Sequence, residues 1–134
     1  MTVSVRLVNP DDLAAPVGFS HAAVGQGRPV VLAGQIGCDA TGRIERPDAL
    51  VAQFGKALDN LLAALRAAGG APTDVALLRI HTTQVETYRR SLKELGAAYR
   101  DRFGKHYPTM CLVGVTELFA PGTLVEIEGL AYVD

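Results

Sequence analysis

The feature that most constrains the fold of this chain is a long amphipathic segment between Pro47 and Ala68. Its large apolar residues recur at spacings of three and four, which places them on one face of an α-helix. They are Leu50, Val51, Phe54, Leu58, Leu61, Leu62 and Leu65. Pro47 suits the first position of a helix, and Gly69-Gly70 suits a left-handed stop after it. The sequence therefore predicts one helix here, with a single apolar face.

A second helical pattern runs from about Tyr88 to Phe103. Its apolar stripe consists of Leu92, Leu95, Tyr99 and Phe103. Gly96 lies inside this pattern and lowers its helix stability by roughly 1 kcal/mol relative to alanine. The segment is still predicted to be a helix, because its apolar residues keep the helical period.

Six further segments are rich in β-branched or apolar residues and are bounded by Gly, Pro or Asp, which is typical of strands. They are Val3–Val8, His21–Gly25, Pro29–Ala33, Val75–Thr83, Met110–Thr116 and Leu124–Val133. Gly25-Gln26-Gly27 predicts a hairpin turn between the second and third strands. The order predicts a single α+β domain over residues 1–134, with a roughly six-stranded sheet and two helices packed on one face.

The last predicted strand has two unlike faces. Its period of two places Val125, Ile127 and Ala131 on one side. The other side carries Leu124, Glu126, Glu128, Leu130 and Tyr132. That side is too apolar for a purely solvated surface and too acidic for an ordinary core. Two interpretations remain open, a subunit interface with a cleft and an edge strand with alternating charges.

Composition excludes several classes of protein. The 134 residues fit one domain of ordinary size, and 49% apolar with 20% charged residues argues against disorder. A formal net charge of −1 argues against a nucleic acid or an anionic membrane as partner. No stretch approaches the roughly 20 apolar residues of a membrane span. The amino terminus lacks the apolar region of a secretory signal, so Cys38 and Cys111 are expected as reduced thiols in a cytoplasmic protein.

Several segments together carry a resemblance to a known family. They are Gly18–Val24, Val31–Gly37, Gln53 with Ala57–Leu61, Ala67–Gly69, Tyr107-Pro108 and Val125–Gly129. In their order and spacing they resemble the RidA/YjgF family over residues 17–133. This resemblance implies a chorismate-mutase-like α+β fold, assembled as a homotrimer with ligand clefts between adjacent subunits. It also implies hydrolysis of enamine and imine intermediates, such as 2-aminoacrylate, to 2-keto acids and ammonia, without a metal or organic cofactor.

The resemblance assigns roles to individual residues. Glu126 matches the family glutamate that positions or activates water, a general acid or base. Met110 stands where active members have an arginine that binds the substrate carboxylate. Phe19 replaces a cleft tyrosine, and Ala33 replaces a serine before Gly34. By the same comparison, Gly96 stands at a helix position that is asparagine in the family. The expected cleft is therefore more apolar than usual and suits a neutral or aromatic ligand.

Other reactive side chains give weaker indications. Arg79 is a candidate for a substitute anchor in the cleft, but an ion pair at a surface or interface is the preferred interpretation. Cys111 could face the cleft as a nucleophile, but no basic neighbour is identifiable, so a buried, unreactive cysteine is preferred. His21, His81 and His106 lack the spacing of metal ligands, so no metal site is expected. A cluster of basic residues on the second helix and its exit, balanced by acids, indicates a solvated helix face. It contains Arg89, Arg90, Lys93, Arg100, Arg102 and Lys105.

Three functions remain open from the sequence. The first is a RidA-like hydrolase of enamines or imines with an altered substrate preference. The second is a homotrimer that binds a small metabolite without catalysis, because Met110 cannot bind a carboxylate. The third, endoribonuclease or translation-inhibitor activity, is the weakest, because the net charge is close to zero and no basic groove is identifiable.

Overall fold

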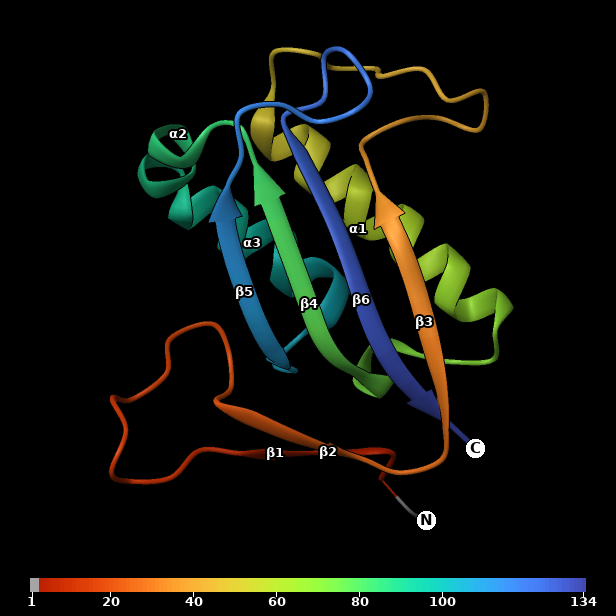
Figure 1. Ribbon diagram of the computed structural model, residues 1–134, viewed down its shortest axis with the longest axis vertical. Coiled ribbons are helices and arrows are strands. Elements are labelled where there is room, and N and C mark those ends of the chain that lie inside the picture. Colours follow the sequence, from red (N-terminus) through yellow and green to blue (C-terminus); the bar gives the residue numbers. More distant parts are fainter. Residues whose placement is uncertain (1–2) are drawn as a thin grey trace.

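The computed structural model describes residues 3–134. The segment predicted as the first helix forms α1 (Leu50–Ala67), and the apolar face of this helix covers one side of a sheet (Figure 1). The other elements follow the predicted order closely. They are β1 (Val5–Val8), β2 (Ala22–Gly25), β3 (Arg28–Gln35), a 3-10 turn (Pro72–Asp74), β4 (Val75–Thr82), α2 (Val85–Arg90), α3 (Leu92–Phe103), β5 (Thr109–Gly114) and β6 (Val125–Val133).

Helix α1 ends as predicted but begins later. Gly69 adopts a φ of +92°, and the amide of Gly70 donates a 2.9 Å hydrogen bond to the carbonyl of Leu65, so the glycine pair terminates the helix. Pro47 was predicted at the first helical position, and that prediction is wrong because the helix starts at Leu50. Pro47 lies instead in the preceding loop, where its side chain approaches the loop around Gly122.

The second predicted helix is divided in two. The amide of Ser91 bonds to the carbonyl of Tyr88 in a tight turn that ends α2, and Ser91 then accepts the first bond of α3 from Leu95. Leu95, Tyr99 and Phe103 are buried as predicted, whereas Leu92 is 61% exposed. The break therefore turns the start of α3 away from the core.

The six strands divide between two sheets rather than forming one. Strands β3-β6-β4-β5 make a four-stranded sheet, in which only β4 and β5 are parallel, and β1 pairs with β2 at its lower end in Figure 1. The predicted hairpin at Gly25-Gln26-Gly27 is wrong, because the chain passes there from one sheet to the other. Gly27 makes this turn with a φ of +111°, close to the carbonyl of Val133.

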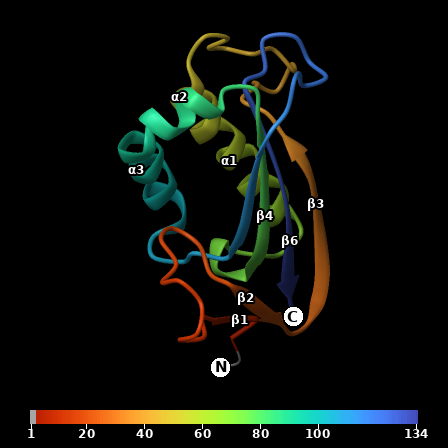
Figure 2. The same cartoon turned by 60° about the vertical axis from the view of Figure 1, so that its left-hand side comes forward.

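The helices lie on one side of the four-stranded sheet, which confirms the predicted α+β arrangement (Figure 2). Side chains from α1, β4 and β6 form the centre of the core and are at most 1% exposed. Among them are Leu58, Leu61, Leu65, Leu78, Ile80, Val125, Ile127 and Ala131. The predicted apolar side of the last strand is therefore confirmed as its buried side.

The opposite side of this sheet, called the open face, carries no helix within residues 3–134. Glu126, Glu128, Leu130 and Tyr132 of β6 lie there, partly exposed. The edge-strand interpretation of this segment is wrong, because β6 pairs with β3 on one side and β4 on the other. Val31 of the true edge strand is 83% exposed on the same face. In the described residues, no helix is both long and apolar enough for a membrane span.

Candidate functional site

The predicted site residues are divided between the two faces of the four-stranded sheet. In β5, Met110 pairs with Leu78, whose side chain is in the core, and Met110 packs against the same core. The next residue, Cys111, pairs with Arg79 and therefore lies on the open face. Phe19 belongs with Met110 on the helix side, whereas Glu126 and Gly34 belong to the open face.

On the helix side, a cavity of about 520 Å³ lies between α2, α3, β5 and the segment around Phe19. Its walls are almost entirely apolar or aromatic. The lining residues are Val17, Gly18, Phe19, Phe54, Ile80, Tyr88, Leu92, Leu95, Gly96, Tyr99, Arg100, Tyr107, Met110 and Leu112. Three positions that the family resemblance singled out, Phe19, Gly96 and Met110, thus meet around one cavity. A cavity of this size and lining suits a small organic ligand.

Hydrogen bonds from Ser20, the residue after Phe19, hold this segment beside the start of β5. The amide of Ser20 donates to the carbonyl of Pro108 at 3.0 Å, and its hydroxyl donates to the carbonyl of Tyr107 at 2.6 Å. The adjoining amide of His21 donates to Oδ1 of Asn9 at 2.7 Å. These hydrogen bonds fix the segment around Phe19 beside the cavity, although this segment belongs to no strand of the four-stranded sheet.

Stacked aromatic rings form one wall of the cavity. The ring of Tyr99 lies 4.7 Å from that of Phe103 and 5.5 Å from that of Tyr107, and its hydroxyl donates to the carbonyl of His106 at 2.7 Å. Tyr88 contacts Phe54 edge to face at 6.1 Å. Burial raises the pKa of Tyr88 to about 12, so its hydroxyl remains protonated at neutral pH. Within residues 3–134 that hydroxyl makes no hydrogen bond, which leaves it free to bond a ligand.

Arg100 is the one charged residue among the side chains that line the cavity. The sequence placed it in a solvated basic cluster, and Arg100 is exposed as predicted, but the sequence did not show that it also lines a cavity. A Cβ atom added at Gly96 would lie 3.0 Å from Nη1 of Arg100, so the guanidinium folds back over the preceding turn of α3. The signal in the sequence was the spacing of Leu92, Gly96 and Arg100, each four residues apart on one side of a helix.

On the open face, Glu126 lies between β3 and β4. It pairs in register with His81, and its carboxylate rests against Gly34, where any added Cβ atom would overlap Oε2. Ala33 is exposed beside Gly34, at the irregular pairing between Leu32 and Gln35. No hydrogen bond to the carboxylate comes from residues 3–134, so it is available to water or a ligand. Gly34 is therefore required for the carboxylate to occupy this position.

Arg79 and Cys111 lie outside the cavity. Nη1 of Arg79 is 3.1 Å from Oε1 of Glu128, which confirms the preferred interpretation as an ion pair. Cys111 was expected to be buried, and that expectation is wrong, because its place on the uncovered face of β5 leaves it exposed. Cys38 and Cys111 are both free thiols. Among the described residues, no three histidine, cysteine or acidic side chains are close enough to hold a metal ion.

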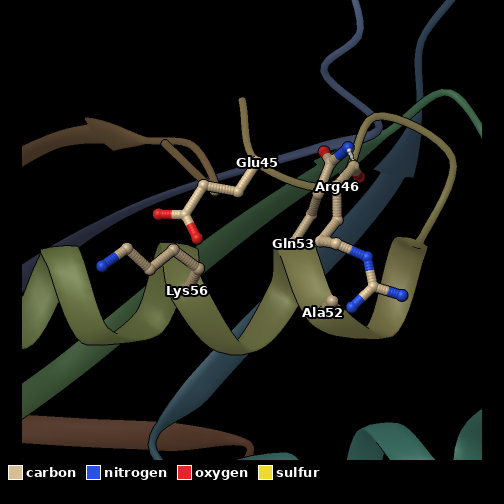
Figure 3. A pocket seen from close by; sticks show the side chains of 6 residues that line it. Glu45, Arg46, Ala52, Gln53 and Lys56 are labelled. Atoms are coloured by element: carbon tan, nitrogen blue, oxygen red, sulfur yellow. Dashed lines mark hydrogen bonds between the residues drawn. The ribbon is translucent and has the colours of Figure 1, made fainter. Parts of the chain in front are cut away.

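A second, smaller pocket of about 260 Å³ lies beside the start of α1 (Figure 3). Glu45, Arg46 and Lys56 surround it, and Gln53 forms its inner wall. Both the nitrogen and the oxygen of the Gln53 carboxamide make hydrogen bonds to the backbone of the protein. Its nitrogen donates to the carbonyls of Arg46 at 2.7 Å and Gly122 at 2.9 Å, and its oxygen accepts from the amide of Leu124 at 2.8 Å. Gln53 at the base of this pocket therefore holds the surrounding loops together and does not offer a free polar group to a ligand.

Comparisons with known proteins agree with this arrangement. The family described as Endoribonuclease L-PSP matches residues 10–133. A RutC family protein of Pyrococcus horikoshii is 30% identical over 128 residues, covering 95% of this chain and 97% of the relative. The crystal structure of the Rid family protein YyfB from Yersinia pestis is similar with a TM-score of 0.87 at 31% identity, covering 97% of this chain and 99% of that one. A RidA from an Antarctic Psychrobacter is similar with a TM-score of 0.68 at 28% identity, over 96% and 98% of the two chains.

Proposed function

Since this chain belongs to the endoribonuclease L-PSP family of RidA and YjgF proteins, we propose that it hydrolyses a small enamine or imine at a site shared by two subunits of a homotrimer. The observation that carries this proposal is the division of the site between two faces of one sheet. The cavity with Phe19 and Met110 lies on the helix side, and Glu126 lies on the open face. One chain cannot bring these parts to a common ligand, whereas two neighbouring chains can.

The open face supports such an assembly. It is an uncovered sheet surface that mixes exposed apolar side chains with charge, including Val31 at 83% and Val113 at 42% exposure. Surfaces of this kind mark sites of protein association. In the proposed homotrimer, the open face of one subunit lies against the cavity mouth of the next. The apolar rim of the cavity, with Val17 88% and Leu92 61% exposed, would be covered at the same time.

The proposed chemistry requires a carboxylate beside the ligand and no metal. An enamine first gains a proton at carbon and loses one from nitrogen, and so becomes an imine. Water then adds across the C=N bond, so that its oxygen bonds to carbon while Glu126 takes one proton from water and passes a proton to nitrogen. The hydroxyl proton of this carbinolamine then moves to nitrogen, the C–N bond breaks as the C=O bond forms, and ammonia and a keto compound are released. The largely apolar cavity and the net charge of −1 favour a small organic ligand of this kind over RNA.

A coupled assay tests the proposal. A pyridoxal-phosphate dehydratase releases 2-aminocrotonate from threonine or 2-aminoacrylate from serine, and the rate of keto-acid formation is followed with and without this protein. We expect the wild type to accelerate product formation and Glu126→Gln to reduce that acceleration by about 10²-fold or more. Glu128→Gln is the matched control, because Glu128 lies on the same strand and face but pairs with Arg79.

Each result has a distinct meaning. An equal loss in both variants would show that the charge of the open face matters rather than Glu126, and would contradict the catalytic role. A wild type that binds small ligands but accelerates neither reaction would leave a metabolite-binding homotrimer as the function. Sedimentation velocity on the same samples measures whether the protein is a trimer.

A further inference from the structure

We infer that Arg100 binds the carboxylate group of the ligand in the helix-side cavity, in place of the arginine that is absent at position 110. The inference rests on the proposed function in one respect, namely that this cavity is the ligand site. It goes beyond that function by assigning a residue from α3 to recognition and by naming the class of ligand, a small organic acid with an apolar or aromatic group.

The first observation is that Arg100 has no acidic partner. In the same region of the chain, the guanidinium of Arg102 is 2.7 Å from Asp59, and Arg89 and Arg90 lie 3.3 and 4.0 Å from Glu86. Within residues 3–134, no carboxylate lies within 4.0 Å of Arg100. No aspartate or glutamate is among the residues that line the cavity. Within one subunit, an anion that enters therefore meets one positive charge and no negative charge.

The second observation is that the helix is shaped to let Arg100 reach the cavity. Leu92, Gly96 and Arg100 occupy one side of α3 and all line the cavity. Gly96 is the residue over which the guanidinium folds, and a Cβ atom there would lie 3.0 Å from Nη1 and 3.7 Å from Cζ of Arg100. Glycine inside a helix lowers its stability, so its presence at this contact requires a separate reason. Space for the arginine is such a reason.

The walls of the cavity define the rest of the ligand. Phe19, Phe54, Tyr88, Tyr99 and Tyr107 supply aromatic surfaces, and Met110 adds an apolar surface where a charged side chain would otherwise be. The unbonded hydroxyl of Tyr88 can donate a single hydrogen bond. A planar guanidinium binds a carboxylate through two parallel hydrogen bonds. Together these groups fit an acid with an apolar or aromatic body.

Benzoate and benzamide are the probes that test this assignment, because they have nearly the same shape and differ in charge. Binding of each to the full-length protein is measured by titration calorimetry or ligand-detected NMR. We expect the wild type to prefer benzoate and Arg100→Gln to weaken benzoate binding about 10- to 100-fold, as for loss of a charge-assisted pair. Benzamide binding should change little. Lys93→Gln is the matched control, since it removes the same charge from an exposed site on α3 outside the cavity.

Three outcomes would overturn the inference. One is a wild type without preference for benzoate over benzamide. Another is an Arg100→Gln variant that keeps the preference. The third is an Arg100→Gln variant that binds both probes more weakly to the same extent and has lost its oligomeric state, which would make Arg100 an interface residue. Failure of the proposed hydrolysis is separate, because it appears as an absence of Glu126-dependent turnover in the coupled assay whatever the binding results.

Discussion

At the scale of single residues, two buried or half-buried contacts position the loops and the carboxylate that the proposed function uses. Gly34 provides the space for Glu126, and Gln53 ties three backbone groups of two loops to α1 through its carboxamide. Gln53 is only 1% exposed, so water cannot replace those bonds if they are lost. One of its partners, Leu124, immediately precedes β6, the strand that carries Glu126.

Replacing Gln53 by methionine should therefore destabilise the protein markedly. The change keeps a side chain of similar length but leaves the amide of Leu124 and the carbonyls of Arg46 and Gly122 without partners. We expect a loss of about 2–4 kcal/mol in the free energy of unfolding, measured by urea denaturation. Gln84→Met is the control, because Gln84 is exposed and should change stability by no more than about 0.5 kcal/mol. Equal effects would show that loss of a glutamine, rather than loss of these bonds, is responsible.

At the scale of elements, helix α3 carries a conflict between stability and the proposed function. Gly96 is a poor helix residue, yet alanine there would press on the guanidinium of Arg100. Gly96→Ala should raise the free energy of unfolding by about 0.5–1 kcal/mol, provided that the flexible arginine moves aside. The same movement should weaken benzoate binding. Ala97→Gly, at an exposed position of α3, should lower stability by a similar amount without affecting benzoate. An alanine variant with unchanged affinity would mean that Gly96 does not serve Arg100.

The elements also show what could be predicted from the sequence. The face of α1 and the buried side of β6 followed from local periodicity alone, because each face packs on a single layer. The separate β1–β2 sheet could not be predicted, since strand pairing depends on contacts between distant residues. The break at Ser91 has no glycine or proline to signal it. Arg100 is exposed as predicted, but charge and periodicity do not reveal that a cavity lies beside this face of the helix.

At the scale of the whole molecule, the arrangement of the site makes the proposed activity a property of the assembly. Each proposed site takes its cavity from one subunit and Glu126 from its neighbour, because the two lie on opposite faces of a single sheet. A variant with a filled cavity and a variant without the carboxylate would each be inactive alone. In a mixed trimer, however, some sites combine the intact cavity of one variant with the intact Glu126 of the other.

This predicts recovery of activity on mixing. Glu126→Gln and Gly96→Phe are unfolded together and refolded as a one-to-one mixture. In the second variant, a phenyl ring fills part of the cavity that Gly96 lines. Because chains assort at random in a closed trimer, about a quarter of the sites should be intact, and activity should return to about a quarter of the wild-type value. Circular dichroism of each variant checks that it folds, and refolding each alone is the control. Mixtures that remain inactive although both variants form trimers would place the cavity and Glu126 in separate sites and contradict the proposed function.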